Sequence, residues 1–462
     1  MVTRWLGGGR RFNASKTVRQ FFSSLPAQYH GTVSLGTTLS FSLNTRTLDN
    51  GLLVTASHDP LAPGAAVNLW YGVGSADDPS GAAGFAHLFE HLMFAGSANV
   101  PDGQHTLMLE ALGGLANATT SPDRTNYFET VPAGALDLAL WLEADRLASL
   151  AVSGKALATQ RAVVHEEKRQ RYDNPPYGDQ LALMLAQVFP PCHPYATPAI
   201  GSMTDLDAAS LEDVLAFHAT WYRPDNASLV VVSPLDDDQV FRSAERYLGA
   251  VPAPDNPPAR RANLTPLPQM TMLSRRRASR PVPRSVLHLM WRTPPLTHPL
   301  RPAVSLAFDV LASGPTSRLH RDLVRDQGLA QSVGASDFGL TRGTSLGAIS
   351  APPAAGRNLE PLEEAIVDHI TALAADGPTP AELERAKAQL ERDWFAGLAG
   401  ASDRADAINE SIVEWGDAAF VNNQLENWLA VTPDDVATAA GTWLNPANRG
   451  VLEYLAEQEM AA

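Results

Sequence analysis

The sequence predicts an α+β protein built from two related halves. Its 462 residues exceed what one compact domain usually holds. The segment 221–226 (WYRPDN) recurs 222 residues later as 443–448 (WLNPAN). Each copy follows a helical pattern and precedes an apolar, strand-like run, at 229–232 and 451–455. A duplicated α+β unit of roughly 200 residues is the economical explanation.

Periodicity places the main elements of the first half. Alternating apolar and polar residues predict strands, and longer amphipathic tracts predict helices. The expected strands are 47–56, 66–73 and 125–131, and the expected helices are 84–94, 135–150 and 154–171. The proline-rich stretch 251–261 and the basic stretch 274–280 read together as a surface linker between the halves.

Composition excludes several classes of protein. The single cysteine, Cys192, permits neither an internal disulfide nor a cysteine-based zinc cluster. A net charge of −15 argues against nucleic acid as a partner, because nucleic-acid binders usually carry a basic surface. No run approaches the length of about 18 apolar residues that a membrane helix needs. We therefore expect neither a nucleic-acid partner nor a membrane span.

The N-terminal segment bears on localisation. The first 48 residues contain no Asp or Glu and several Arg, which is weakly similar to a transit peptide. The strong preference for Arg over Lys along the whole chain favours a GC-rich bacterial genome. We expect a bacterial cytoplasmic protein with a plain N-terminal extension, with the mitochondrial matrix as the alternative.

The segment 84–96 carries the chemistry. On a helix, His87 and His91 lie one turn apart on the same face, close enough to share one metal ion. Glu90 lies near them in angle and can approach a water on that metal. Every other side chain from Phe85 to Phe94 is apolar, so the helix should be buried, and buried ionisable groups need a partner. The pattern His-x-x-Glu-His is the inverted form of the zinc-protease helix.

A catalytic zinc usually has three protein ligands and a water, so a third ligand is required. The candidates lie in the polar end of the 154–171 helix. Composition alone leaves His165, Glu166 and Glu167 open.

The chain resembles the pitrilysin/insulinase family of zinc peptidases, in the two-domain branch that includes the mitochondrial processing peptidase and bacterial homologues. The resemblance covers nearly all of the chain from about residue 46. It rests on the inverted motif and on a set of supporting matches: 48–51, 113–114, 117–118, Thr125, Tyr127, 163–174, 193–195, Gly201, 317–319, 323–325 and 328–330. It implies two related domains, each a mainly antiparallel sheet with helices packed on one face. The implied ranges are an extension at 1–45, a zinc-binding catalytic domain at 46–250, a linker at 251–282 and a C-terminal domain without zinc motif at 283–462.

The same resemblance implies the site. The family's third ligand closes a Val-Val-x-x-Glu pattern about 76 residues after the second histidine, which selects Glu167. It implies one Zn²⁺ per chain, Glu90 as the general base, and an edge strand at 113–120 that binds peptides through Asn117 and Ala118. The activity implied is that of an endopeptidase acting on peptides or unfolded segments in a chamber.

A departure from the family pattern concerns the second half. Active members usually supply an arginine and a tyrosine that bind the substrate backbone. Here Arg325 is present, but Gln331 stands where the tyrosine is expected. We therefore expect a dimer, with a related subunit lacking the zinc motif as the second member. The alternatives are a non-catalytic subunit or a peptide-binding subunit of a heteromeric complex.

Overall fold

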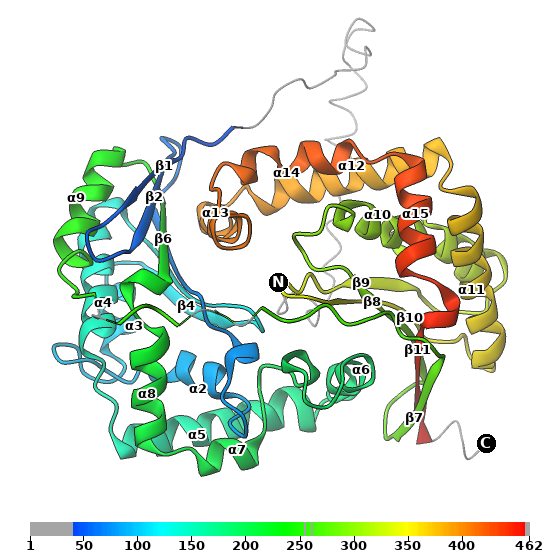
Figure 1. Cartoon of the computed structure of the whole chain (residues 1–462), viewed down its shortest axis with the longest axis horizontal. Coiled ribbons are helices and arrows are strands. Elements are labelled where there is room, and N and C mark those ends of the chain that lie inside the picture. Colours follow the sequence, from blue (N-terminus) through cyan, green and yellow to red (C-terminus); the bar gives the residue numbers. More distant parts are fainter. Residues whose placement is uncertain (1–39, 254–255, 260, 262, 458–462) are drawn as a thin grey trace, which may run out of the picture. The chain divides into compact units, whose positions relative to one another are not determined.

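Two β-sheets organise the chain (Figure 1). A computed structural model describes residues 40–253, 256–259, 261 and 263–457. The first sheet has the order β1-β2-β6-β3-β5-β4 and the second the order β7-β11-β8-β10-β9. The strands of the first are β1 (Asn44–Thr47), β2 (Leu53–His58), β3 (Ala65–Tyr71), β4 (Leu115–Thr120), β5 (Thr125–Val131) and β6 (Ala227–Ser233). Those of the second are β7 (Ser274–Arg280), β8 (Val286–Thr293), β9 (Gly334–Asp337), β10 (Ser345–Ala351) and β11 (Gly450–Ala456).

The two sheets repeat one topology. In the first sheet only β2 and β6 are parallel, with Leu53 opposite Ser228. In the second only β7 and β11 are parallel, with Ser274 opposite Gly450. All other neighbouring strands are antiparallel. Strands β2-β6-β3-β5-β4 therefore match β7-β11-β8-β10-β9 position by position, which confirms the predicted α+β fold of two related, mainly antiparallel halves.

Helices cover the sheets. Those of the first half are α2 (Phe85–Leu92), α3 (Gln104–Glu110), α4 (Leu136–Ser149), α5 (Gly154–Lys168), α6 (Gln180–Val188), α7 (Met203–Ala208), α8 (Leu211–Trp221) and α9 (Asp237–Tyr247). Those of the second are α10 (Arg301–Ala312), α11 (Leu359–Asp376), α12 (Pro380–Gly397), α13 (Ala401–Trp415), α14 (Phe420–Leu429) and α15 (Pro433–Trp443). The first core joins Val67 and Val231 of the sheet to Leu88 of α2, Leu140 of α4 and Phe241 of α9. None of the helices in the described part of the chain has both the length and the hydropathy that crossing a membrane requires.

The second face of each sheet is covered by a helix from the other half. The described residues from Phe41 onward belong to one compact unit. Ile408 and Ile412 of α13 pack on Ala66 and Val230 of the first sheet. In the same way, α6 packs on the second sheet, as one cluster that contains Leu183, Met290 and Leu452 shows. Helices α6 and α13 occupy equivalent places in the repeat, so the halves exchange one helix each.

Strands lie at or inside two of the predicted ranges where none was expected. β1 begins at Asn44, ahead of the expected boundary at residue 46. Residues 1–39 of the predicted extension lie outside the described part of the chain. β7 falls inside the stretch expected as a linker. Its four arginines make the segment look like a polar loop in the sequence. In the structure, Arg275 and Arg277 pair with Glu453 of the neighbouring strand β11 at 2.5 Å. As a division into domains, the four ranges stay a prediction.

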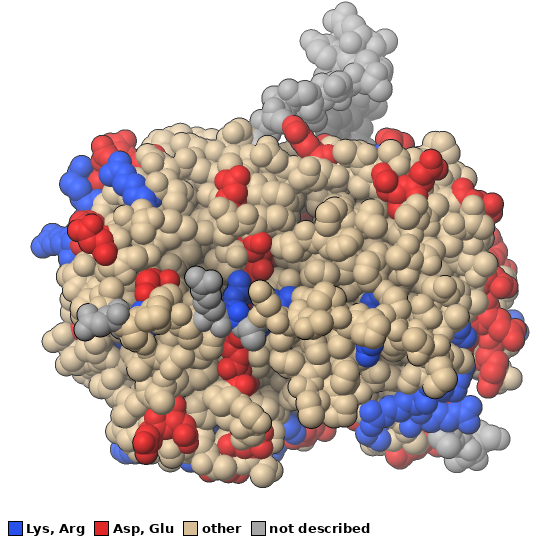
Figure 2. Space-filling view, in the orientation of Figure 1, with Lys and Arg blue, Asp and Glu red and all other residues tan. Residues whose placement is uncertain are grey.

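The charged side chains follow the composition. On the face drawn in Figure 2, acidic side chains are scattered, and basic ones gather over β7, where Arg275, Arg276 and Arg277 are exposed. Charges on an edge strand discourage pairing with another chain.

Candidate metal centre

Helix α2 is shaped to present three ionisable side chains. It starts after Gly84, whose φ of 101° belongs to the left-handed region, and a Cβ there would lie 2.9 Å from the Ile200 carbonyl oxygen. Its apolar side chains enter the core of the first half. His87, Glu90 and His91 therefore share the remaining, partly exposed face.

The sequence-predicted ligands converge. Nε2 of His87 lies 3.5 Å and Nε2 of His91 3.3 Å from Oε2 of Glu167 on α5. Ligand atoms around a tetrahedral zinc ion, at bonds of about 2.0–2.2 Å, are separated by about 3.4 Å. Oε2 of Glu167 is buried without a hydrogen-bond partner among the described residues. The donor set therefore fits a metal ion that would satisfy this oxygen.

The electrostatics of the three ligands suit metal binding. Burial lowers the pKa of His87 to about 4, although the charge of Glu167 opposes this shift. Neutral imidazole is the form that coordinates a metal. Burial alone would raise the pKa of Glu167, but its contact with His91 and the charges of His87 and Arg171 lower it below its usual range. Arg171 also donates to Oε1 of Glu167 at 2.5 Å, which leaves Oε2 directed at the histidines.

Glu90 lies beside the ligands and is held by the edge strand. Thr120 at the end of β4 donates to Oε2 of Glu90 at 2.5 Å. Burial raises the pKa of Glu90, and the hydrogen bond from Thr120 opposes that shift. A carboxylate in this setting is suited to exchange protons with a water molecule.

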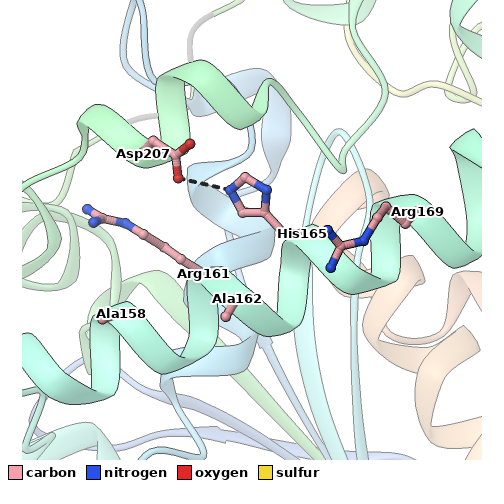
Figure 3. Close-up of a pocket in the computed structure, with 6 residues that line it drawn as sticks. All are labelled: Ala158, Arg161, Ala162, His165, Arg169 and Asp207. Carbon is pink, nitrogen blue, oxygen red and sulfur yellow. Dashed lines mark hydrogen bonds and ion pairs between the residues drawn. The ribbon is translucent and has the colours of Figure 1, made fainter.

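The other two candidates for the third ligand point elsewhere. Glu166 is exposed and accepts hydrogen bonds from Arg169 at 2.5 Å and Gln170 at 2.8 Å. His165 pairs with Asp207 at 2.9 Å in a separate hollow of about 400 Å³ (Figure 3).

The predicted substrate-binding residues form two separate groups. Asn117 is exposed and Ala118 buried on β4, the outer strand of its sheet. Arg325 has a side chain that is 60% exposed and pairs with Asp326. Gln331 accepts a hydrogen bond from Arg284 at 2.6 Å. These polar contacts of Arg325 and Gln331 stay within the second half and do not join them to the metal ligands.

Sequence reasoning missed residues that support α2. Asp78 accepts hydrogen bonds from the backbone N–H groups of Gly84 at 2.7 Å and Ala86 at 2.8 Å, which caps the helix. Thr120 and Arg171 were also missed. A carboxylate six residues before a helix with a glycine start is the one local signal that could have indicated Asp78.

A second buried group of ligand-type side chains lies in the same half. His105 Nε2 is 3.5 Å from Glu129 and 4.0 Å from Glu143. Burial lowers the pKa of His105 to about 3 and raises that of Glu143 to about 8, the latter opposed by the charge of Arg146. Arg146 bonds Glu143 and lies 3.5 Å from Glu129, so it already supplies the positive charge. We therefore interpret this group as an internal ion network.

Comparisons with known proteins identify the family of the chain. Residues 53–189 match the family model described as Insulinase (Peptidase family M16), and residues 208–390 match the one described as Peptidase M16 inactive domain. The chain is 29% identical over 404 residues to a protein of Helicobacter pylori named Zinc protease PqqE, covering 86% of this chain and 89% of that protein.

Solved structures of similar proteins share the fold of this chain. The crystal structure of a protease from Helicobacter pylori superposes with a TM-score of 0.83 at 25% identity, covering 90% of this chain and all of that one. Pitrilysin shares the fold, with a TM-score of 0.75 at 20% identity, covering 90% of this chain and 45% of that chain.

Fold and motif together define a two-sheet protein of the peptidase M16 type, with an inverted His-x-x-Glu-His motif on a largely buried helix. The chain belongs to the insulinase family, peptidase family M16.

Proposed function

We propose that this chain is a zinc-dependent endopeptidase that hydrolyses peptides or unfolded segments and binds one Zn²⁺. The observation that carries the proposal is the convergence of His87, His91 and Glu167 beside Glu90, at the end of an edge strand. The chain's similarity to the Helicobacter pylori protein named Zinc protease PqqE supports it. The ranges 46–250 and 283–462 would then be a catalytic domain and a related domain that helps to enclose the substrate, with the bacterial cytoplasm as the expected compartment.

The chain's own side chains divide the work. His87, His91 and Glu167 hold the metal, which when bound supplies a Lewis acid that polarises the scissile carbonyl and acidifies a water molecule. Glu90 accepts the proton of the attacking water and returns it to the leaving amine. Thr120 fixes the carboxylate of Glu90 for both transfers.

The edge strand provides the substrate site. Among the described strands, β4 pairs with β5 alone, so its other edge is open to pairing with a further strand. An extended peptide that adds to this edge is bound through its backbone, which allows many sequences. Asn117 and Ala118 of β4 would bind the peptide at this edge. Arg325 and Gln331 would approach it from the second half.

The function is tested by metal removal. We expect the purified chain to cleave an unfolded peptide, to lose this activity in a zinc chelator, and to regain it when zinc is added back. Binding of the peptide without any cleavage, in the zinc-loaded chain, would instead indicate a peptide-binding subunit. A chain that retains no zinc would indicate a non-catalytic subunit.

We further expect a dimer, because Gln331 replaces the phenol that the family places near the substrate. The activity of the chain should be low alone and should rise when a related chain that lacks the His-x-x-Glu-His motif is added. Light scattering after size-exclusion chromatography, combined with peptide cleavage, checks this. Full activity in a strictly monomeric preparation contradicts the expectation, whereas an active homodimer keeps the dimer and removes the division of labour.

A further inference from the structure

One arginine of the second half is buried in the first. Arg342 follows β9 in the turn that leads to β10, and only 8% of it is exposed. Its Nη1 donates to Asp77 at 2.7 Å, and its Nε donates to Asp123 at 2.8 Å. Its Nη2 lies 3.3 Å from both Asp77 and the carbonyl oxygen of Pro122. A planar guanidinium suits this simultaneous binding of two carboxylates.

The neighbours of Arg342 reinforce the contact. The backbone N–H of Thr341 donates to Oδ2 of Asp123 at 3.0 Å. The hydroxyl of Tyr195 donates to Oδ1 of the same carboxylate at 2.5 Å and accepts the backbone N–H of Arg342 at 3.0 Å. Every polar atom of the Asp123 side chain therefore faces a donor.

Asp77 and Asp123 belong to two turns that act as one body. The N–H of Ser75 donates to the Ser121 carbonyl at 3.1 Å, and the N–H of Ala76 donates to the Pro122 carbonyl at 2.9 Å. A Cβ at position 74 would lie 2.4 Å from the Pro122 oxygen, so only glycine permits this approach.

Each turn leads directly to the metal centre. Asp78 follows Asp77 and caps the N-terminus of α2, the helix that carries His87 and His91. The other turn, which contains Asp123, begins directly after Thr120, whose hydroxyl holds Glu90. Both connections span only a few residues, so a shift of these turns moves the ligand helix and the base.

We propose that Arg342 is a positioning residue through which the second half fixes the metal-ligand helix and Glu90. The second half, although it carries no metal motif, thereby contributes to the geometry of the centre. This inference rests on the proposed function for its kinetic part only.

The test compares R342A with R318A. Arg318 is a matched control, because it is 11% exposed and holds Glu382 through two hydrogen bonds of 2.8 Å, but within the second half. In the metal-free chain we expect R342A to speed hydrogen exchange of the backbone amides in 74–92 and 115–126, and R318A to leave them unchanged. With zinc, R342A should lower zinc affinity and kcat by about 10–100-fold, with a smaller change in KM. R342K, which keeps the charge but loses the fork, should fall in between.

Exchange and zinc affinity in R342A equal to those in R318A overturn the inference, even if R342A melts earlier. If R342A does not fold, D77N carries the test, because the amide oxygen can still accept the N–H of Gly74 while the ion pair is lost. Unchanged exchange in D77N then overturns the inference. A wild-type chain that neither binds zinc nor cleaves peptides would instead refute the proposed function, and the exchange measurement would still decide the role of Arg342.

Discussion

The substitution Glu90→Gln is expected to slow peptide hydrolysis by about 10²–10⁴-fold while leaving the zinc content unchanged. The amide can still accept the hydrogen bond from Thr120, and the three ligands stay in place. What is lost is the group that takes a proton from the attacking water. The measurement is kcat on an unfolded peptide, together with metal analysis of the same preparation.

Two further variants serve as a control and as an intermediate case for Glu90→Gln. Glu110→Gln, at the exposed end of α3, should behave like the wild type in both measurements. Thr120→Val keeps the carboxylate but removes its hydrogen bond, so it should retain zinc and lose about 10-fold in kcat, the size expected for a misplaced base. Turnover of Glu90→Gln close to that of the wild type would exclude Glu90 as the general base.

The ligand helix could be predicted from sequence because its information is local. His87 and His91 are separated by one helical turn, and the apolar residues around them fix which face is buried. The fold class was predictable for a related reason, since the repeated segments 221–226 and 443–448 mark equivalent helix ends. In both cases a short stretch of chain contains the whole signal.

Helical periodicity alone does not identify the third ligand. Leu157 and Val164 are buried in the first core, whereas Val163 is 42% exposed. On a helix, Glu167 lies three residues from Val164 and shares its face, and Glu166 does not. The sequence therefore shows that α5 has an apolar side. Whether Val163 or Val164 lies on that side is decided only by packing against the rest of the first half, which buries Val164.

The non-local contacts could not be predicted. Thr120 and Arg342 act on the centre through hydrogen bonds between segments whose approach depends on the complete fold. The exchange of α6 and α13 is of the same kind, because an amphipathic helix buries its apolar face on either sheet equally well. Strand β7 could not be predicted because its arginines pair with Glu453 only when the second sheet has formed.

Loss of any one metal ligand is the other large effect that we expect. His87→Ala, His91→Ala and Glu167→Gln should each weaken zinc binding by more than about 100-fold, the upper end of what removing an outer-shell partner costs. Each variant removes one of three protein donors, and a site with two protein donors holds zinc poorly. Competition with a chromophoric chelator measures the affinity.

The neighbouring glutamate provides the sharpest control for the ligand assignment. Glu166→Gln changes the same chemical group one residue away, yet Glu166 is exposed and bonded to Arg169 and Gln170, so zinc affinity should stay at the wild-type value. A ligand that binds only the folded chain raises its melting temperature, so added zinc should stabilise Glu166→Gln and not Glu167→Gln. If Glu166→Gln lost the metal while Glu167→Gln kept it, the ligand set built on the 3.5 Å and 3.3 Å contacts of Glu167 would be wrong. The same pair of variants also tests the orientation of α5, because Glu166 and Glu167 differ only in which side of this helix they occupy.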